Sequence, residues 1–293
     1  MLRISNFEDH IEILNGTRIA WTDGGDGPPL LLLHGFPQTR ALWAEIAPEL
    51  AREYRVICPD LRGYGQSGKP GDVSEYSFRM MAQDQLALMR HLGFEDFRVA
   101  GHDRGARVAH RLALDAPEAV TRMALMDIVP THTLLSQLRR DVAQAYYHWF
   151  FLAQPEPFPE NMIGEDPDAY FMSCLLGWGA ARLEDFTPAQ LEAYRAAWRD
   201  ADAIRGMCND YRATLAHDFE DDAADLGAQI PCPTMVLYGA DGAMGRMYDM
   251  EAVWAEKCSD MRVLGLPGGH FFPDTAPSET TEALRGFFRA TQS

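Results

Sequence analysis

Short apolar runs that end in turn residues recur along this chain, and stretches with helical spacing lie between them. The runs are Leu30–Pro37, Arg55–Asp60, Phe97–Asp103, Met123–Pro130, Thr234–Gly242 and Met261–Phe272. Continuous apolar runs of this length indicate strands buried on both faces. Because helical patterns alternate with them, at Ser77–Leu92 and Ala106–Leu114 for example, we expect an α/β fold. The sheet should be twisted and mostly parallel, with helices on both faces.

Two segments depart from this alternation. Near the N-terminus, Asn15-Gly16 between two apolar runs predicts a tight hairpin. Residues 138–212 are rich in aromatic residues, broken by prolines and without a strand pattern, so we expect a helical cap there. The cap would divide the core into residues 1–137 and 213–293, and a helix near Ser278–Ala290 would close the chain.

Composition excludes several classes of function. With 293 residues, 47% of them apolar, the chain can bury a large core. A net charge of −17 argues against binding to nucleic acid or to an anionic membrane. No apolar run approaches the roughly 18 residues of a membrane span, and the first residues lack the apolar stretch of a secretory signal.

The cysteine pattern predicts a cytoplasmic protein with reduced thiols. The five cysteines are odd in number, scattered, and form no C-x-x-C pair. Such a pattern favours neither a disulfide framework nor a zinc site. We expect no metal and no cofactor.

The segment Gly101-His102-Asp103-Arg104-Gly105 has the frame of a nucleophile elbow, G-x-S-x-G, with Asp103 in place of serine. A serine that attacked a saturated carbon would form an ether, which water does not cleave. A carboxylate that displaces a leaving group from saturated carbon forms an ester, whose carbonyl is open to water. Asp103 therefore predicts substitution at a carbon–halogen bond or an epoxide. The alternative is that Asp103 is held in an ion pair by Arg104 or Arg107.

Together these motifs resemble the α/β-hydrolase fold. The order Asp103, Asp127, His270 fits that family, as do "HGFP" at 34–37 and "DLRGYGQS" at 60–67. Within the family, "GHDRGARVAHRLALD", the cap pair "HW" and "DYR" near the cap's end are most similar to the fluoroacetate (haloacetate) dehalogenases. Haloalkane dehalogenases usually carry tryptophan directly after the nucleophile. Here that residue is Arg104, which argues against neutral haloalkanes.

The resemblance implies a role for each candidate site residue. Asp103 would be the nucleophile, and His270 would activate the water that cleaves the ester. Asp127 is favoured as the acid that orients His270, with Asp241 as the alternative. The predicted halide donors are His148, Trp149 and Tyr211, and the backbone N–H groups of Phe36 and Arg104 would form the oxyanion hole.

Arg104 and Arg107 are three residues apart at a helix start, so both can face one ligand. Two guanidinium groups would hold the carboxylate of a small anionic haloacid. Surface arginines paired with nearby acids are the alternative. The resemblance also implies a homodimer.

Two other functions stay open. An epoxide hydrolase would use the same Asp and His with two cap tyrosines, Tyr211 and one of Tyr146, Tyr147 or Tyr170. A receptor built on a hydrolase scaffold would bind a small acid without turnover, since a fold does not determine a function.

Overall fold

The computed structural model describes residues 2–177 and 181–289, and it contains one eight-stranded sheet. The strands lie in the order β1-β2-β4-β3-β5-β6-β7-β8. Their bounds are β1 Glu8–Leu14, β2 Thr17–Gly24, β3 Pro29–Leu33, β4 Arg55–Pro59, β5 Phe97–His102, β6 Val120–Met126, β7 Thr234–Gly239 and β8 Met261–Leu266. From β4 to β8 in that order, all neighbours are parallel, which confirms the expected mostly parallel sheet.

The antiparallel part is the β1–β2 hairpin and the pairing of β2 with β4. Leu14 faces Thr17, so Asn15 and Gly16 form the predicted two-residue turn. Both have positive φ, 49° and 77°, as a type I′ turn requires.

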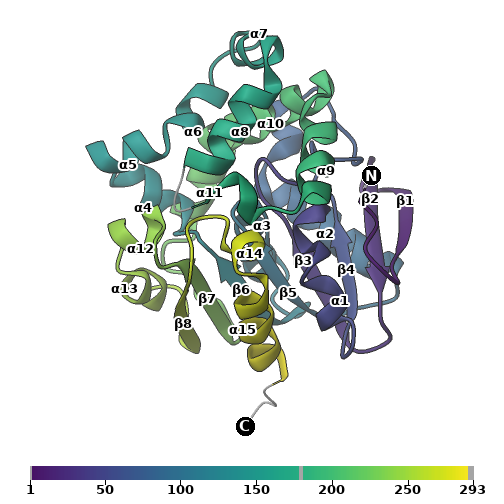
Figure 1. Cartoon of the computed structure of the whole chain (residues 1–293). Helices are drawn as coiled ribbons and strands as arrows, with labels where there is room; N and C mark the ends of the chain where they lie inside the picture. Colours follow the sequence, from purple (N-terminus) through teal and green to yellow (C-terminus); the bar gives the residue numbers. More distant parts are fainter. Residues whose placement is uncertain (1, 178–180, 290–293) are drawn as a thin grey trace.

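Helices cover both faces of the sheet, as expected (Figure 1). Both faces need cover because successive side chains of a strand point to opposite faces of the sheet, as strand β3 illustrates. Leu31 and Leu33 belong to a core that includes α2 (Phe78–His91) and α3 (Arg104–Asp115). Leu30 and Leu32 belong to a second core with α1 (Ala47–Leu50) and α15 (Pro277–Arg289). Residue 290, the expected last residue of the closing helix, lies outside the described residues.

A long helical segment separates β6 from β7 and lies over one end of the sheet (Figure 1). Its helices are α4 Thr131–Ser136, α5 Arg140–Ala145, α6 Tyr147–Leu152, α7 Phe158–Glu165, α8 Pro167–Gly177, the 3-10 helix η3 Leu183–Asp185, α9 Pro188–Trp198, α10 Ala201–Ala213, the π-helical turn η4 Thr214–Asp218 and α11 Phe219–Ala224. Residues 178–180, part of the expected cap, lie outside the described residues. Helices thus extend beyond 138–212 on both sides, and those cap limits stay a prediction.

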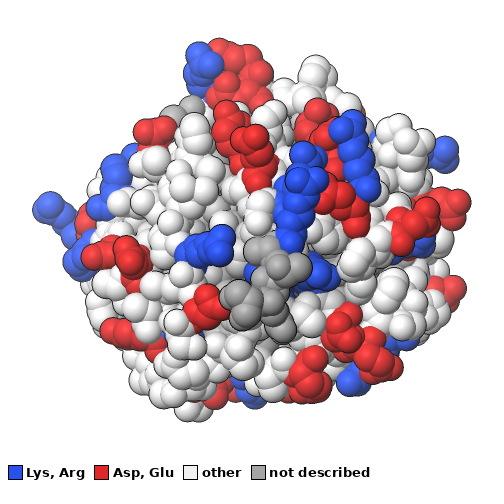
Figure 2. All heavy atoms as spheres, turned by 90° about the horizontal axis from the view of Figure 1, so that it is seen from below, with Lys and Arg blue, Asp and Glu red and all other residues white. Residues whose placement is uncertain are grey.

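The helices α12 (Ala243–Met247), α13 (Met250–Ala255) and α14 (Phe272–Thr275) flank β7 and β8 in sequence, and the short 3-10 helices η1 (Arg40–Ala44) and η2 (Val73–Tyr76) lie earlier in the chain. Figure 2 shows basic side chains interspersed with acidic ones on the face seen from below. Within the described ranges, no helix is both long and apolar enough to cross a bilayer. All five cysteines are buried and free.

Candidate active site

Asp103 sits in a sharp turn between β5 and α3, with φ 48° and ψ −115°. Such a backbone conformation is rare for a residue with a side chain and is typical of functional sites. The two glycines of the motif make the turn possible. A Cβ atom on Gly101 would overlap the backbone of Gly105, and one on Gly105 would overlap the backbone of Leu33 and His34.

The Asp103 carboxylate is 6% exposed and accepts a hydrogen bond from the Phe36 N–H to Oδ2 at 3.0 Å. The other expected oxyanion donor, the N–H of Arg104, belongs to the residue that begins α3. Among the described residues, no arginine lies within ion-pair distance of Asp103. Within the described residues, Asp103 is therefore not held in an ion pair with Arg104 or Arg107.

His270 lies after β8 and contacts Asp127, which lies after β6. Its Nδ1 is 2.7 Å from Asp127 Oδ2, and the other Asp127 oxygen accepts the Gly239 N–H at 2.9 Å. Burial lowers the pKa of His270, but the hydrogen bond and charge of Asp127, with the charge of Asp103, leave that pKa raised overall. Asp241 is exposed and accepts the Gly268 N–H at 3.2 Å. Of the two acids, Asp127 is thus the one hydrogen-bonded to His270.

Arg107 is a buried guanidinium without a carboxylate partner among the described residues. Its Nη1 donates to the Val129 carbonyl at 2.9 Å and to the Thr131 hydroxyl at 3.0 Å. Its Cζ lies 4.7 Å from the centre of the Trp149 ring. Burial lowers the pKa of Arg107, and the charge of Asp103 opposes that effect. An uncompensated buried charge costs several kcal/mol, and a bound anion would offset that cost.

Arg104 differs, because Asp210 of α10 already neutralises it. Arg104 Nε donates to Asp210 Oδ2 at 2.9 Å, and Nη2 donates to Oδ1. The alternative expectation is that the arginines pair with acids at the surface. Arg104 does pair with an acid, but the pair is buried. The guanidinium Cζ lies 4.3 Å from the Tyr211 ring centre and 4.5 Å from that of Phe78.

The three predicted halide donors come together beside these arginines. The His148 and Trp149 rings lie 5.6 Å and 5.7 Å from the Tyr211 ring, edge to face. Burial lowers the pKa of His148 well below its usual value and raises that of Tyr211, so both are neutral. The buried Tyr211 hydroxyl has no hydrogen-bond partner within the described part of the chain. Phe36 packs against this cluster, with its ring 5.2 Å from that of Tyr211.

A cavity of about 100 Å³ reaches this region from the side of α12. His270 and Tyr146 line it, together with Arg246 and Met247. His270 is therefore a buried side chain that borders a cavity.

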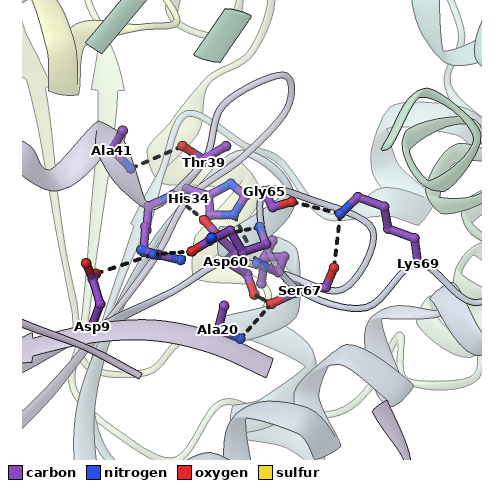
Figure 3. A network of polar contacts seen from close by, with 12 residues as sticks. Asp9, Ala20, His34, Thr39, Ala41, Asp60, Gly65, Ser67 and Lys69 are labelled. Atoms are coloured by element: carbon purple, nitrogen blue, oxygen red, sulfur yellow. Dashed lines mark hydrogen bonds and ion pairs between the residues drawn. The ribbon is translucent and has the colours of Figure 1, made fainter. Parts of the chain in front are cut away.

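Asp60 also follows a strand end but does not belong to the site. Its Oδ1 accepts the Arg40 N–H at 2.9 Å, and its Oδ2 accepts from Arg40 Nη1 at 2.6 Å (Figure 3). His34 connects two loops, because its Nε2 accepts the Leu61 N–H at 3.0 Å and its Nδ1 contacts the Gly35 carbonyl. Burial lowers the pKa of His34, so it is neutral and structural.

Sequence reasoning missed two sets of buried groups around the site. Asp210 precedes the expected Tyr211, but nothing in "DYR" indicates that its carboxylate binds Arg104. A second set joins the helical segment between β6 and β7 to the rest of the chain: Asp274 accepts from Gln38 at 2.6 Å and from the Tyr194 hydroxyl of α9 at 2.8 Å. Burial raises the pKa of Asp274 to about 7. The described residues contain no group of three or more side chains that could hold a metal ion.

Comparison with known proteins agrees with this architecture. A family model described as alpha/beta hydrolase fold matches residues 28–277. The chain is 51% identical to a fluoroacetate dehalogenase from Burkholderia sp., over 98% of this chain and 95% of the relative. It is 29% identical to a soluble epoxide hydrolase from Corynebacterium sp. (strain C12), over 95% of this chain and 96% of the relative.

Among solved structures, a crystal structure of an alpha/beta hydrolase from Nostoc sp. PCC 7120 superimposes with a TM-score of 0.96 at 46% identity, covering 99% of this chain and 100% of that one. A family model over most of the chain, the fold and the sequence identity all agree. The protein belongs to the α/β-hydrolase fold family.

Proposed function

We propose that this protein is a haloacetate dehalogenase that converts fluoroacetate and water to glycolate and fluoride. The observation that carries the proposal is that one buried region holds an elbow carboxylate, Asp103, and a guanidinium, Arg107, which has no ion-pair partner among the described residues. A nucleophile for saturated carbon thus lies in the same site as a receptor for a carboxylate. The 51% identity to a fluoroacetate dehalogenase supports the same conclusion.

Substrate binding would use Arg107 and the remaining nitrogen of Arg104. Arg107 has Nε without a partner among the described residues, and Arg104 has Nη1. Charge-assisted hydrogen bonds from both would hold the carboxylate. The carbon that bears the halogen would then lie at Asp103.

In the first step, Asp103 Oδ1 attacks that carbon, the carbon–halogen bond breaks, and the halide leaves with the bonding electrons. Oδ2 is assigned to the oxyanion hole because it accepts the Phe36 N–H. Fluoride is small and strongly hydrated, so it needs hydrogen-bond donors in a pocket without bulk water. His148, Trp149 and Tyr211 would supply them. The Tyr211 hydroxyl, which has no hydrogen-bond partner among the described residues, supports that role.

In the second step, His270 takes a proton from water, and the resulting hydroxide adds to the ester carbonyl of Asp103. The bond between the carbonyl carbon and the glycolate oxygen then breaks, and His270 returns its proton to glycolate. Asp103 is left as a carboxylic acid, and it loses the remaining proton to solvent, which restores the carboxylate. Asp127 holds the His270 tautomer in which Nε2 would act as the base.

The charge of Asp103 links the two steps. That charge raises the pKa of His270 in the free protein. Ester formation removes it, so the pKa of His270 falls in the intermediate. The lower pKa favours the neutral form of the histidine, which a base requires, in the step that needs it.

One observation supports a second candidate, an epoxide hydrolase. Tyr146 borders the cavity beside His270, and its ring lies 5.9 Å from that of His148, which in turn contacts Tyr211. Tyr146 and Tyr211 could therefore protonate an epoxide oxygen. Tyr147 is 47% exposed, which disfavours it. A neutral epoxide, however, leaves the charge of Arg107 without a function.

A fluoride-selective electrode separates these candidates. Incubation with fluoroacetate should release fluoride, and incubation with a simple terminal epoxide should form no diol. Diol formation without fluoride would favour the epoxide hydrolase. A small-acid receptor would produce neither. In a single turnover in ¹⁸O-water, glycolate should stay mostly unlabelled because its new oxygen comes from Asp103.

Three further properties remain proposals: a helical cap at residues 138–212, a homodimer and a cytoplasmic location. The dimer rests on resemblance alone. Light scattering on the purified chain should give twice the mass of one protomer, and the mass of a single chain would contradict it.

A further inference from the structure

Asp210 is a buried carboxylate of the helical segment that binds an arginine of the core. The side chains of Arg104 and Asp210 are both fully buried. Two hydrogen bonds from Arg104 reach the two Asp210 oxygens, and Nη2 also donates to the Asp210 carbonyl at 3.0 Å. A forked contact of this kind determines the plane of the guanidinium as well as its position.

Two further residues complete this frame. The Tyr64 hydroxyl donates to Asp210 Oδ2 at 2.6 Å, and the Thr214 hydroxyl donates to the Asp210 carbonyl at 3.0 Å. Thr214 also accepts a hydrogen bond from Arg104 Nη2. Nε and Nη2 of Arg104 are therefore fully used. Nη1 is the nitrogen left, buried and without a partner within the described ranges.

We infer that Asp210 is a positioning residue: it holds Arg104 so that Nη1 faces the substrate carboxylate and the guanidinium stays away from Asp103. This inference rests on the proposed function. Arg104 directly follows the nucleophile, and a guanidinium bound to Asp103 would make that carboxylate a weaker nucleophile. Asp210 neutralises Arg104, whereas Arg107 has no carboxylate within ion-pair distance among the described residues.

Asp210→Asn keeps the shape of the side chain but removes its charge. The new amide group would face a donor, either Arg104 Nε–H or Nη2–H, so one branch of the fork must break. The freed guanidinium then has a buried carboxylate available in Asp103. We expect slower attack on the substrate carbon, by roughly 10- to 100-fold, the usual effect of losing a hydrogen bond to a charged group.

The test measures ester formation directly. In a His270→Ala background, which should stall at the ester, bromoacetate is added and the modified Asp103 peptide is quantified by mass spectrometry over time. The matched control is Asp84→Asn. Asp84 is also fully buried and also binds an arginine in a fork, at 2.8 Å and 2.6 Å from Arg62, but it lies outside the site. It should stay within about twofold of the background rate.

A double-mutant cycle separates positioning from general damage. If Asp210 acts through Arg104, then Asp210→Asn added to Arg104→Gln should slow the reaction by less than about twofold. A full additional loss, or an unchanged rate in Asp210→Asn alone, would overturn the inference. Should Asp210→Asn fail to fold, Tyr64→Phe replaces it in the same cycle, and an unchanged rate there would overturn it too. No ester on Asp103 in the background protein would instead refute the proposed function.

Discussion

Replacing Arg107 with methionine should separate activity from stability. Methionine keeps an unbranched apolar side chain but removes the buried charge and the two hydrogen bonds, to Val129 and Thr131. Each such bond from a charged donor contributes about 1.5–3 kcal/mol to the free energy of unfolding. Burying a guanidinium without a carboxylate partner costs several kcal/mol. These terms oppose each other, so we expect the free energy of unfolding to change by no more than about 2 kcal/mol.

Activity should respond very differently. Removing the cation that faces a buried carboxylate costs about 3–5 kcal/mol, which is roughly 100- to several-thousand-fold in kcat/KM for fluoroacetate. The matched control is Arg111→Met, one turn further along α3. Arg111 pairs with Asp115 and Asp225, so its loss should lower stability and spare activity.

Fluoride release gives kcat/KM, and urea unfolding gives the free energy of unfolding. Less than a tenfold loss of kcat/KM in Arg107→Met would refute the assignment of Arg107 to the substrate carboxylate. The same assignment would be refuted if kcat/KM fell in both Arg107→Met and Arg111→Met in proportion to the loss in the free energy of unfolding.

Further predictions concern the two steps and the link between cap and core. His270→Ala exposed to substrate should carry added mass on Asp103, and an unmodified chain would contradict its role as the base. The pKa of His270 measured by NMR in the free protein should lie above its usual value. The pH dependence of kcat should give a lower apparent pKa, because the Asp103 charge is absent from the ester intermediate. If the two pKa values were equal, the proposed effect of the Asp103 charge would be wrong. Trp149→Phe should harm fluoroacetate turnover more than chloroacetate turnover, because chloride needs less hydrogen bonding; similar losses would exclude Trp149 from the halide pocket. Burial raises the pKa of Asp274 to about 7, so between about pH 4 and 7 Asp274 is protonated in the folded protein and ionised in the unfolded chain. The free energy of unfolding should therefore decrease as the pH rises from about 4 to 7. The decrease should be smaller in Asp274→Asn.

Local patterns determined most of the fold. The expected strands and the two core helices coincide with β3 to β8, α2 and α3, because buried strands and amphipathic helices have periods that a short window of sequence reveals. The elbow was equally local, since its glycines and Asp103 lie within five consecutive residues. The limits of the helical segment were less accessible, because helices continue on both sides of 138–212.

The partners of the site residues were a different matter. Asp127 and Asp241 both follow strands near His270, and only the packing of β6, β7 and β8 brings Asp127 to 2.7 Å from it. Arg104 and Arg107 look equivalent in sequence, three residues apart on one helix.

The sequence by itself determined the α/β architecture and the residue types available for a nucleophile, an acid, a base and anion binding. Tertiary structure alone decided that Arg104 is neutralised by Asp210, 106 positions away along the chain, while Arg107 has no ion-pair partner among the described residues. The physical reason is that charge compensation in a buried site depends on distances of a few ångströms between elements remote in sequence, and no local pattern encodes those distances.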